Sequence, residues 1–191
     1  MNKKLVITEK PSVASDIASA LSIKKKHKGY FEGEDYLITW AIGHLLELQD
    51  PEDMDKKYKS WLLKDLPIIP KKFKWKVVSR TRDQYRIIQG LLKDEDVSSV
   101  INACDAGREG ELIFREIVER EKVKKPLERL WLQSMTHEAI RDGFDKLAPG
   151  SQFDGLADSA KSRSESDWLI GINGTRAITK RLQSRAKRTV F

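Results

Sequence analysis

The feature that most constrains this chain is an apolar segment that runs directly into a glycine-flanked acidic one. Residues 97–104 have the apolar content of a buried strand, and residues 105–111 then read Asp-Ala-Gly-Arg-Glu-Gly-Glu. This order predicts a strand, a tight turn and a helix that begins near Arg108. Carboxylates gathered at such a joint repel one another by roughly 4 kcal/mol per pair, at 4 Å and an effective dielectric of about 20. Because a divalent cation would relieve that repulsion, the joint is a candidate metal site.

Short apolar strands alternate with amphipathic helices through most of the chain. Strands are expected at residues 5–7, 30–31, 36–42, 75–78, 97–104 and 127–132, and helices from Pro11 onward and at residues 82–93, 108–121 and 136–147. Parallel neighbours in a sheet need crossover connections, usually helices. The order therefore predicts an α/β fold with a Rossmann-like parallel sheet flanked by helices.

Two parts of the chain fall outside that alternation. Residues 30–31 and 36–42 are expected to form an antiparallel accessory pair, and residues 50–74, with three prolines, a long loop with one helical turn. Further on, residues 149–155 look like a linker. A helical extension is expected from residue 156 to the end, divided if Gly171 or Gly174 interrupts it.

Composition and the amino terminus exclude several classes of protein. No apolar run approaches the roughly 20 residues that span a bilayer, and Thr8 and Glu9 interrupt the first apolar stretch too early for a secretory signal. The chain is therefore expected to act in the cytoplasm, without a membrane partner. The single cysteine, Cys104, is expected to be a small buried hydrophobe. His44 and His137 lack the spacing of zinc ligands.

The basic excess is concentrated at one end of the chain. There are 36 Lys and Arg residues against 29 acidic ones, a net charge of +7. Six basic residues and no acidic one follow residue 175, and without them 30 basic residues face 29 acidic ones; they are Arg176, Lys180, Arg181, Arg185, Lys187 and Arg188. This end is a candidate contact for a polyanion. An ordinary solvated helix face remains the alternative.

Acidic residues also follow two of the predicted strands. Glu9 comes directly after the first strand and Asp105 after the strand at residues 97–104. If these strands are neighbours, Glu9, Asp105 and Glu109 share the edge of the sheet where ligands bind. Hard oxygen ligands select Mg²⁺, and backbone N–H groups at a helix start bind phosphate. Helix capping also favours acids in a first turn, so a purely structural role stays open for them.

Four motifs stand in order along nearly the whole chain. They are residues 7–12 (Ile-Thr-Glu-Lys-Pro-Ser), 43–47 (Gly-His-Leu-Leu-Glu), 105–111 and 167–176 (Asp-Trp-Leu-Ile-Gly-Ile-Asn-Gly-Thr-Arg). This set resembles the type IA DNA topoisomerases, most closely their bacterial topoisomerase III branch. The resemblance implies a Toprim catalytic domain over residues 1–148. A linker and the opening helices of the domain that borders the single-stranded DNA groove would follow over residues 149–191.

The resemblance also implies roles for individual residues. The family's Toprim glutamate and acidic ladder correspond to Glu9, Asp105 and Glu109, which would hold Mg²⁺. Glu9 and Lys10 would be catalytic, and Lys10 would stabilise charge at the scissile phosphate or donate a proton to the leaving 3′ oxygen. Contacts with single-stranded DNA are implied for Lys10, His44, Arg108, Arg176 and Lys180. The parent enzyme would cleave, pass and religate single DNA strands, as a monomer associated with the nucleoid.

The sequence departs from the family pattern in two places. The usual ladder is Asp-x-Asp-x-Glu, but Gly107 stands at its middle position, so we expect one weakly held Mg²⁺, engaged mainly beside a DNA phosphate. The family's nucleophile is a tyrosine of a distal domain. None of the four tyrosines here lies in such a motif; they are Tyr30, Tyr36, Tyr58 and Tyr85. The chain is therefore expected to be an amino-terminal fragment that relaxes no DNA by itself.

Two alternative functions remain at this point. A Toprim nuclease or primase-like enzyme would use the same acids with two metal ions, although the motif at residues 167–176 belongs to the topoisomerase resemblance alone. A non-catalytic DNA-binding module would depend on the basic end of the chain.

Overall fold

A seven-stranded, mostly parallel sheet carries the acidic joint. In the computed structural model, which describes residues 2–186 and side chains as far as Leu182, the strand order is β2-β3-β4-β1-β7-β8-β9. The strands that run parallel to one another are β4 (Tyr36–Trp40), β1 (Lys3–Thr8), β7 (Val97–Asn102) and β8 (Leu127–Arg129). Antiparallel strands complete the two edges: β2 (Lys25–His27) with β3 (Tyr30–Glu32) on one side, and β9 (Ala148–Pro149) on the other.

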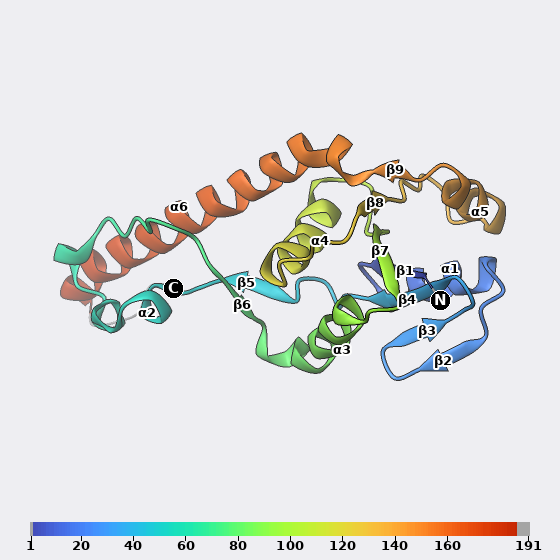
Figure 1. The fold of residues 1–191 in the computed structure, drawn as a ribbon. Coiled ribbons are helices and arrows are strands. Elements are labelled where there is room, and N and C mark those ends of the chain that lie inside the picture. Colours follow the sequence, from blue (N-terminus) through green and yellow to red (C-terminus); the bar gives the residue numbers. More distant parts are fainter. Residues whose placement is uncertain (1, 187–191) are drawn as a thin grey trace. The chain divides into compact units, whose positions relative to one another are not determined.

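Helices flank this sheet (Figure 1). They are α1 (Pro11–Ala20), α3 (Arg82–Lys93), α4 (Arg108–Arg120) and α5 (His137–Asp145). One core cluster joins Ile17 of α1 and Ile140 of α5 to Val6, Ile38 and Ile101 of the three central strands. Because side chains alternate along a strand, the buried neighbours of Val6 serve the opposite face, and α3 and α4 bury apolar side chains of their own. Burial on both faces is typical of parallel sheets.

The chain divides into two compact units. The sheet unit comprises residues 2–46 and 77–160, and the helical unit comprises residues 47–76 and 161–186 of the described part. The helical unit contains α2 (Pro51–Met54), two 3-10 helices (Lys56–Ser60 and Leu63–Asp65) and most of the long helix α6 (Asp154–Ala186). No helix within residues 2–186 combines the length and apolar character needed to cross a membrane.

The predicted fold class is confirmed, and two helices fall where the periodicity placed them. Helix α3 covers residues 82–93 and α4 begins at Arg108. The strands that precede Glu9 and Asp105 are neighbours, because β1 pairs in parallel with β7. Glu9 and Asp105 therefore follow neighbouring strands, as the predicted acidic site requires.

One expectation about local structure was wrong, and two were confirmed in part. Residues 30–31 and 36–42 do pair antiparallel, as β3 with β4, but the pair is not accessory, because β4 also pairs in parallel with β1 inside the main sheet. A strand is present at residues 75–77 as predicted, but this strand, β6 (Trp75–Val77), lies outside the main sheet and pairs with β5 (Leu46–Leu48). Residues 149–155 are not a linker, because they complete β9, form a 3-10 helix and begin α6.

Helix α6 is continuous through both of its central glycines. Gly171 and Gly174 lie within its 33 residues, and an added Cβ would meet no atom within 4 Å at either position. Each glycine costs a helix only about 1 kcal/mol relative to alanine. That cost is too small to break a helix of this length.

Contacts with α6 order the segment that was expected to be a long loop. The Asn173 amide accepts a hydrogen bond from Ile68 N at 2.6 Å and donates one to Ile68 O at 3.0 Å. Trp168 donates from Nε1 to Gln49 O at 3.1 Å and meets the ring of Phe73 edge-on. These bonds satisfy backbone groups that a free loop would leave to water.

Candidate functional site

The carboxyl ends of β1 and β7 bring Glu9 and Asp105 to one place. The two strands pair in register with Ile7 beside Asn102, and Ala103 N donates to Ile7 O at 2.8 Å just beyond the pair. Glu9 follows β1 and Asp105 follows β7 within a few residues of this rung. Parallel pairing therefore joins two acids that are far apart in the sequence.

The ammonium group of Lys10 lies between these two acids. Its Nζ is 2.9 Å from Asp105 Oδ2 and 3.4 Å from Glu9 Oε1. The hydrogen bond to Asp105, and then the charge of Glu9, raise the pKa of Lys10 above its ordinary value. Lys10 is therefore a firmly charged cation, and about half of its side chain is exposed to solvent.

Glu9 retains ligand capacity that Lys10 does not use. Its Oε2 is buried and has no hydrogen-bond partner among the described atoms, and its side chain is only 12% exposed. A buried carboxylate oxygen without a partner is costly and suits an oxygen-seeking cation. Glu9 and Asp105 thus fit a Mg²⁺ ion that takes one or two protein carboxylates.

Glu109 does not join this pair in the structure. Its Oε1 forms a short hydrogen bond with His44 Nε2. Among residues 2–186, no three His, Cys, Asp or Glu side chains gather closely enough to hold a metal ion. Of the three predicted ligands, two therefore meet at Lys10 and the third lies with His44.

His44 connects Glu109 to a buried acid that the sequence did not single out. Its Nδ1 is 3.7 Å from Oε2 of Glu116, whose side chain is 3% exposed. The carboxylate of Glu116 is the largest influence on the pKa of His44, which rises to about 9 although burial opposes the charge. Burial raises the pKa of Glu116 to about 7. Glu116 lies two turns beyond Glu109 on the same helix face, which is the one signal that could have found it.

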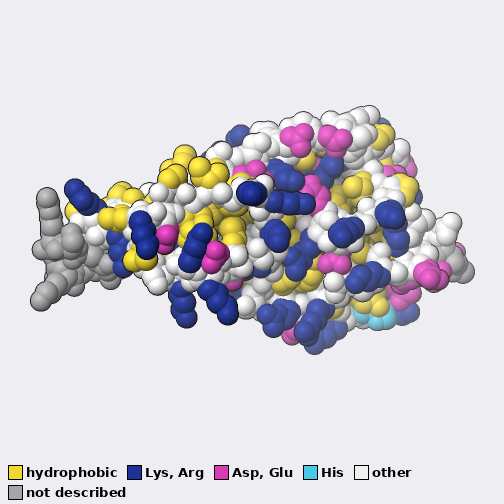
Figure 2. All heavy atoms as spheres, turned by 60° about the vertical axis from the view of Figure 1, so that its left-hand side comes forward, with side chains coloured by type: hydrophobic (Ala, Val, Ile, Leu, Met, Phe, Trp, Pro, Cys, Tyr) yellow, Lys and Arg dark blue, Asp and Glu magenta, His cyan; other side chains and the backbone are white. Residues whose placement is uncertain are grey.

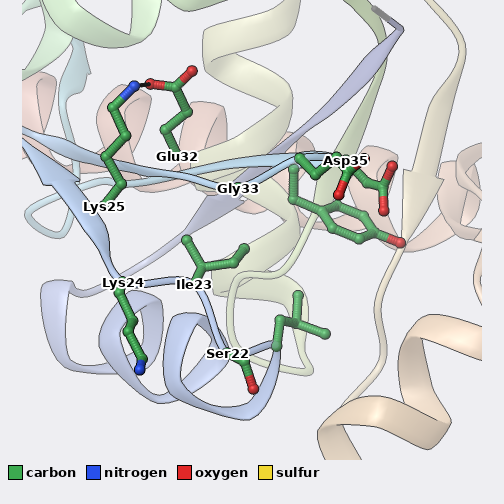
Figure 3. A pocket seen from close by; sticks show the side chains of 10 residues that line it. Ser22, Ile23, Lys24, Lys25, Glu32, Gly33 and Asp35 are labelled. Carbon is green, nitrogen blue, oxygen red and sulfur yellow. Dashed lines mark ion pairs between the residues drawn. The ribbon is translucent and has the colours of Figure 1, made fainter.

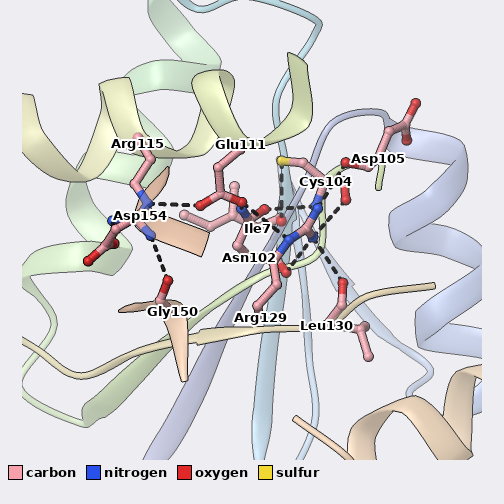
Figure 4. Close-up of polar contacts among 10 residues, drawn as sticks. All are labelled: Ile7, Asn102, Cys104, Asp105, Glu111, Arg115, Arg129, Leu130, Gly150 and Asp154. Carbon is pink, nitrogen blue, oxygen red and sulfur yellow. Dashed lines mark hydrogen bonds and ion pairs between the residues drawn. The ribbon is translucent and has the colours of Figure 1, made fainter. Parts of the chain in front are cut away.

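The turn that carries Asp105 rests on a second buried group that sequence reasoning missed. Arg129, at the end of β8, is 1% exposed, and so is its partner Glu111. Figure 4 shows Arg129 beneath the turn, with hydrogen bonds to several backbone carbonyls. Nothing in the spacing of the sequence links residues 105 and 129.

The start of α4 offers backbone N–H groups to an anion. Gly107 is the residue that precedes the helix, and no side chain caps it. The first N–H groups of a helix lack internal partners and attract phosphate. Arg108 is exposed at the first position of the same helix, so this end presents a cation beside free donors.

Arg176, a predicted DNA contact, is buried within the helical unit. It is 3% exposed, donates to Glu52 Oε1 at 2.8 Å and to Tyr58 O at 2.7 Å, and stacks over the ring of Trp61. A guanidinium held in this way is not available to a phosphate. The geometry supports a structural role for Arg176 rather than the predicted DNA contact.

The remaining basic residues near the end of α6 give a mixed result. Lys180 is half-buried and Arg181 is exposed. Lys187 and Arg188 lie outside the described residues, as does the side chain of Arg185. On the face drawn in Figure 2, basic side chains are interspersed with acidic ones. Separately, Cys104 is buried as predicted, and burial raises the pKa of its thiol.

A pocket of about 630 Å³ lies in the sheet unit, away from the candidate site. It is formed by the end of α1, by β2 and by the turn between β3 and β4 (Figure 3). Its charged wall is the ion pair of Lys25 with Glu32, 2.7 Å apart, and the side chains of Ser22 and Lys24 point away from that pair (Figure 3). The polar groups therefore do not converge on one ligand position.

Comparison with known proteins places this geometry in a family. The family model described as "Toprim domain" matches residues 4–134, more than half of the chain. The chain belongs to the Toprim family. The match covers Glu9, Lys10, Asp105 and Arg129 but ends before α6, so the Toprim segment contains the candidate site.

Bacterial relatives share a longer stretch than this Toprim segment. The chain is 50% identical over 185 residues to DNA topoisomerase 3 of Bacillus cereus and 49% identical over 183 residues to that of Staphylococcus haemolyticus. These alignments cover 97% and 96% of this chain but 25% and 26% of the relatives. The chain thus spans about a quarter of the length of these relatives.

A structural neighbour supports the fold. The structure of full-length topoisomerase I from Thermotoga maritima matches with a TM-score of 0.61 and 17% identity, over 97% of this chain and 27% of that one. At this identity the likeness establishes the Toprim fold alone.

The His44 cluster gives a prediction about pKa. Replacing Glu116 with Gln should lower the pKa of His44 from about 9, because the Glu116 carboxylate is the main cause of its elevation. NMR titration of the His44 ring protons measures this shift, and Glu109→Gln is the matched control with a smaller fall. An unchanged pKa of His44 in Glu116→Gln would contradict the geometry.

The same elevation fixes the sign of its effect on stability. The pKa of folded His44, about 9, lies above its ordinary value of 6.5. The contribution of His44 to the free energy of unfolding is therefore complete below about pH 6.5 and disappears as the pH rises through about 9.

Proposed function

We propose that this chain forms the Mg²⁺-dependent part of a type IA DNA topoisomerase, which cleaves, passes and religates single DNA strands. The observation that carries the proposal is the convergence of Glu9 and Asp105, from neighbouring parallel strands, on the ammonium of Lys10. Two carboxylates and a cation at the carboxyl edge of a parallel sheet suit the handling of a phosphodiester. The similarity to bacterial topoisomerase 3 proteins supports the same assignment.

Glu9 and Asp105 are the proposed ligands of the metal ion. Bound there, Mg²⁺ would neutralise phosphate charge and help to position the ends of the broken strand for religation. The buried free oxygen of Glu9 supports its place in the ligand set. Glu109 is proposed as a third, weaker ligand. Because Gly107 supplies no side chain, one ion is proposed rather than two.

Lys10 is the proposed catalytic cation. Its raised pKa keeps it protonated at neutral pH, so it stabilises negative charge on the scissile phosphate. The same ammonium group has a proton to donate to the leaving 3′ oxygen. Its exposed side chain leaves room for the backbone of DNA to approach.

Single-stranded DNA is the proposed partner. We propose that the protein binds it as a monomer, in the cytoplasm and in association with the nucleoid. Lys10, His44, Arg108 and Lys180 remain the proposed contacts, and the exposed Arg108 beside the start of α4 fits this role best. Residues 1–148 are the proposed Toprim catalytic domain, and residues 149–191 the proposed opening of the domain that borders the DNA groove.

None of the four tyrosines is proposed as the nucleophile. Tyr85 is buried and bonded to Glu121, Tyr36 packs against Phe144, and Tyr30 stacks on His27. The ring of Tyr58 lies 4.8 Å from the ammonium of Lys57. Covalent cleavage would therefore need a tyrosine from outside these 191 residues.

Metal binding tests the ligand assignment. Titration of the chain with Mg²⁺, in the presence of a short single-stranded oligonucleotide, should show one ion. Glu9→Gln and Asp105→Asn should each weaken that binding about tenfold or more, since each removes a ligand oxygen. Glu34→Gln, which changes an exposed acid in the turn between β3 and β4, is the matched control and should bind normally. Two tightly held ions, or no effect of either variant, would sink the assignment.

A plasmid assay tests the absence of a nucleophile. The purified chain, incubated with supercoiled DNA and Mg²⁺, should leave the DNA supercoiled, because no tyrosine is placed to attack a phosphate. The Bacillus cereus DNA topoisomerase 3 serves as the comparison enzyme. Clear relaxation by the chain would refute the argument, and Mg²⁺-dependent nicking would favour the nuclease alternative.

A further inference from the structure

We propose that Arg129 is a positioning residue that holds the backbone of Asp105 at the point where its side chain meets Glu9 and Lys10. The inference rests on the proposed function, because the group held in place is a proposed Mg²⁺ ligand. Arg129 itself contacts neither Lys10 nor Glu9 in the described hydrogen bonds and ion pairs. It acts through the turn.

The guanidinium of Arg129 binds four carbonyl oxygens around this turn. Nη1 donates to Asn102 O at 2.9 Å, Cys104 O at 2.8 Å and Leu130 O at 2.9 Å. Nη2 donates to Asp105 O at 2.9 Å. Three of these carbonyls belong to residues 102–105, where β7 ends and the turn begins. Only the planar fork of arginine reaches all of them from one buried position.

Gly110 confines the same carbonyl from another direction. A Cβ at Gly110 would lie 2.2 Å from Asp105 O and 2.8 Å from Asp105 N, distances that no side chain tolerates. The first turn of α4 therefore packs directly against the backbone of Asp105. Arg129 and Gly110 are independent constraints on one peptide group.

Buried partners keep the Arg129 guanidinium in place. Glu111 provides its counter-charge, with Oε2 3.3 Å from Arg129 Nε, and also accepts hydrogen bonds from Asn102 and Arg115. The ring of Trp131 lies 4.9 Å from the guanidinium carbon. A buried charge is costly unless it is paired and hydrogen-bonded; here Glu111 pairs with the charge and both Nη atoms are hydrogen-bonded, while Nε has no hydrogen-bond partner among the described atoms. The result is a rigid support beneath the turn (Figure 4).

A change from Arg129 to Lys separates positioning from charge. Lysine keeps the positive charge beside Glu111 but has three donors on one nitrogen, so it cannot bridge the four carbonyls. The backbone of residues 102–105 should then fluctuate more, and the carboxylate of Asp105 should be held less firmly beside Glu9 and Lys10. Groups that orient metal ligands commonly change metal affinity by about 10- to 100-fold, and we expect a loss of about tenfold here.

The experiment uses the full chain and Mn²⁺ as a paramagnetic probe. In the presence of a short single-stranded oligonucleotide, Mn²⁺ affinity by electron paramagnetic resonance and amide hydrogen exchange over residues 105–110 are measured for wild type and Arg129→Lys. The expected result is weaker Mn²⁺ binding and faster exchange confined to this turn. Arg115→Lys is the matched control, because Arg115 shares Glu111 but donates to Gly150 O and not to the turn. It should change neither quantity by more than about twofold.

The outcomes distinguish this inference from the proposed function. If wild type binds no Mn²⁺, the metal assignment fails, and the exchange rates alone decide the role of Arg129. If Arg129→Lys folds and keeps wild-type affinity and exchange, the positioning role is refuted. If Arg129→Lys does not fold, the double variant Arg129→Gln with Glu111→Gln takes its place, since it leaves no unpaired buried charge and an amide with two donors cannot bridge the four carbonyls. Wild-type affinity and exchange in a folded double variant would then overturn the proposal.

Discussion

The parallel pairing of β1 with β7 is the interaction on which the rest of the site depends. It places Ile7 beside Asn102 at the ends of two strands, although these residues are 95 positions apart in the chain. The residues of the candidate site all follow this strand pair: Glu9 and Lys10 come after β1, and Asp105 comes after β7. A slip of one residue would turn the side chains of one strand to the opposite face relative to its neighbour, and would remove Val6 from the core cluster that it shares with Ile101.

Electrostatics explains why the two acids are not left alone at this edge. Two carboxylates that face one position repel each other, and the ammonium of Lys10 offsets that repulsion in the structure. A divalent ion would offset it more strongly while adding a site for phosphate oxygen. Such an arrangement would suit the negatively charged phosphodiester of the proposed function.

Sequence patterns predicted the parts of the molecule that local rules control. The helical period placed α3 and α4, and the strand-to-turn order placed Asp105 and Glu9 at one edge. Long-range contacts decided what was missed. Arg129 reaches residues 102–105 only after β8 has paired with β7. The order of the segment expected to be a loop depends on Asn173, about a hundred residues further on. Neither contact is reflected in a hydrophobic period or a residue spacing of the sequence.

The central claim is that Glu9 and Asp105 share one divalent ion. Anomalous diffraction from crystals of the chain grown with Mn²⁺ and a short single-stranded oligonucleotide tests it most directly. The account predicts one anomalous peak within coordination distance of both carboxylates, beside a DNA phosphate. A peak bound by other residues, or DNA bound with no ion between Glu9 and Asp105, would contradict it.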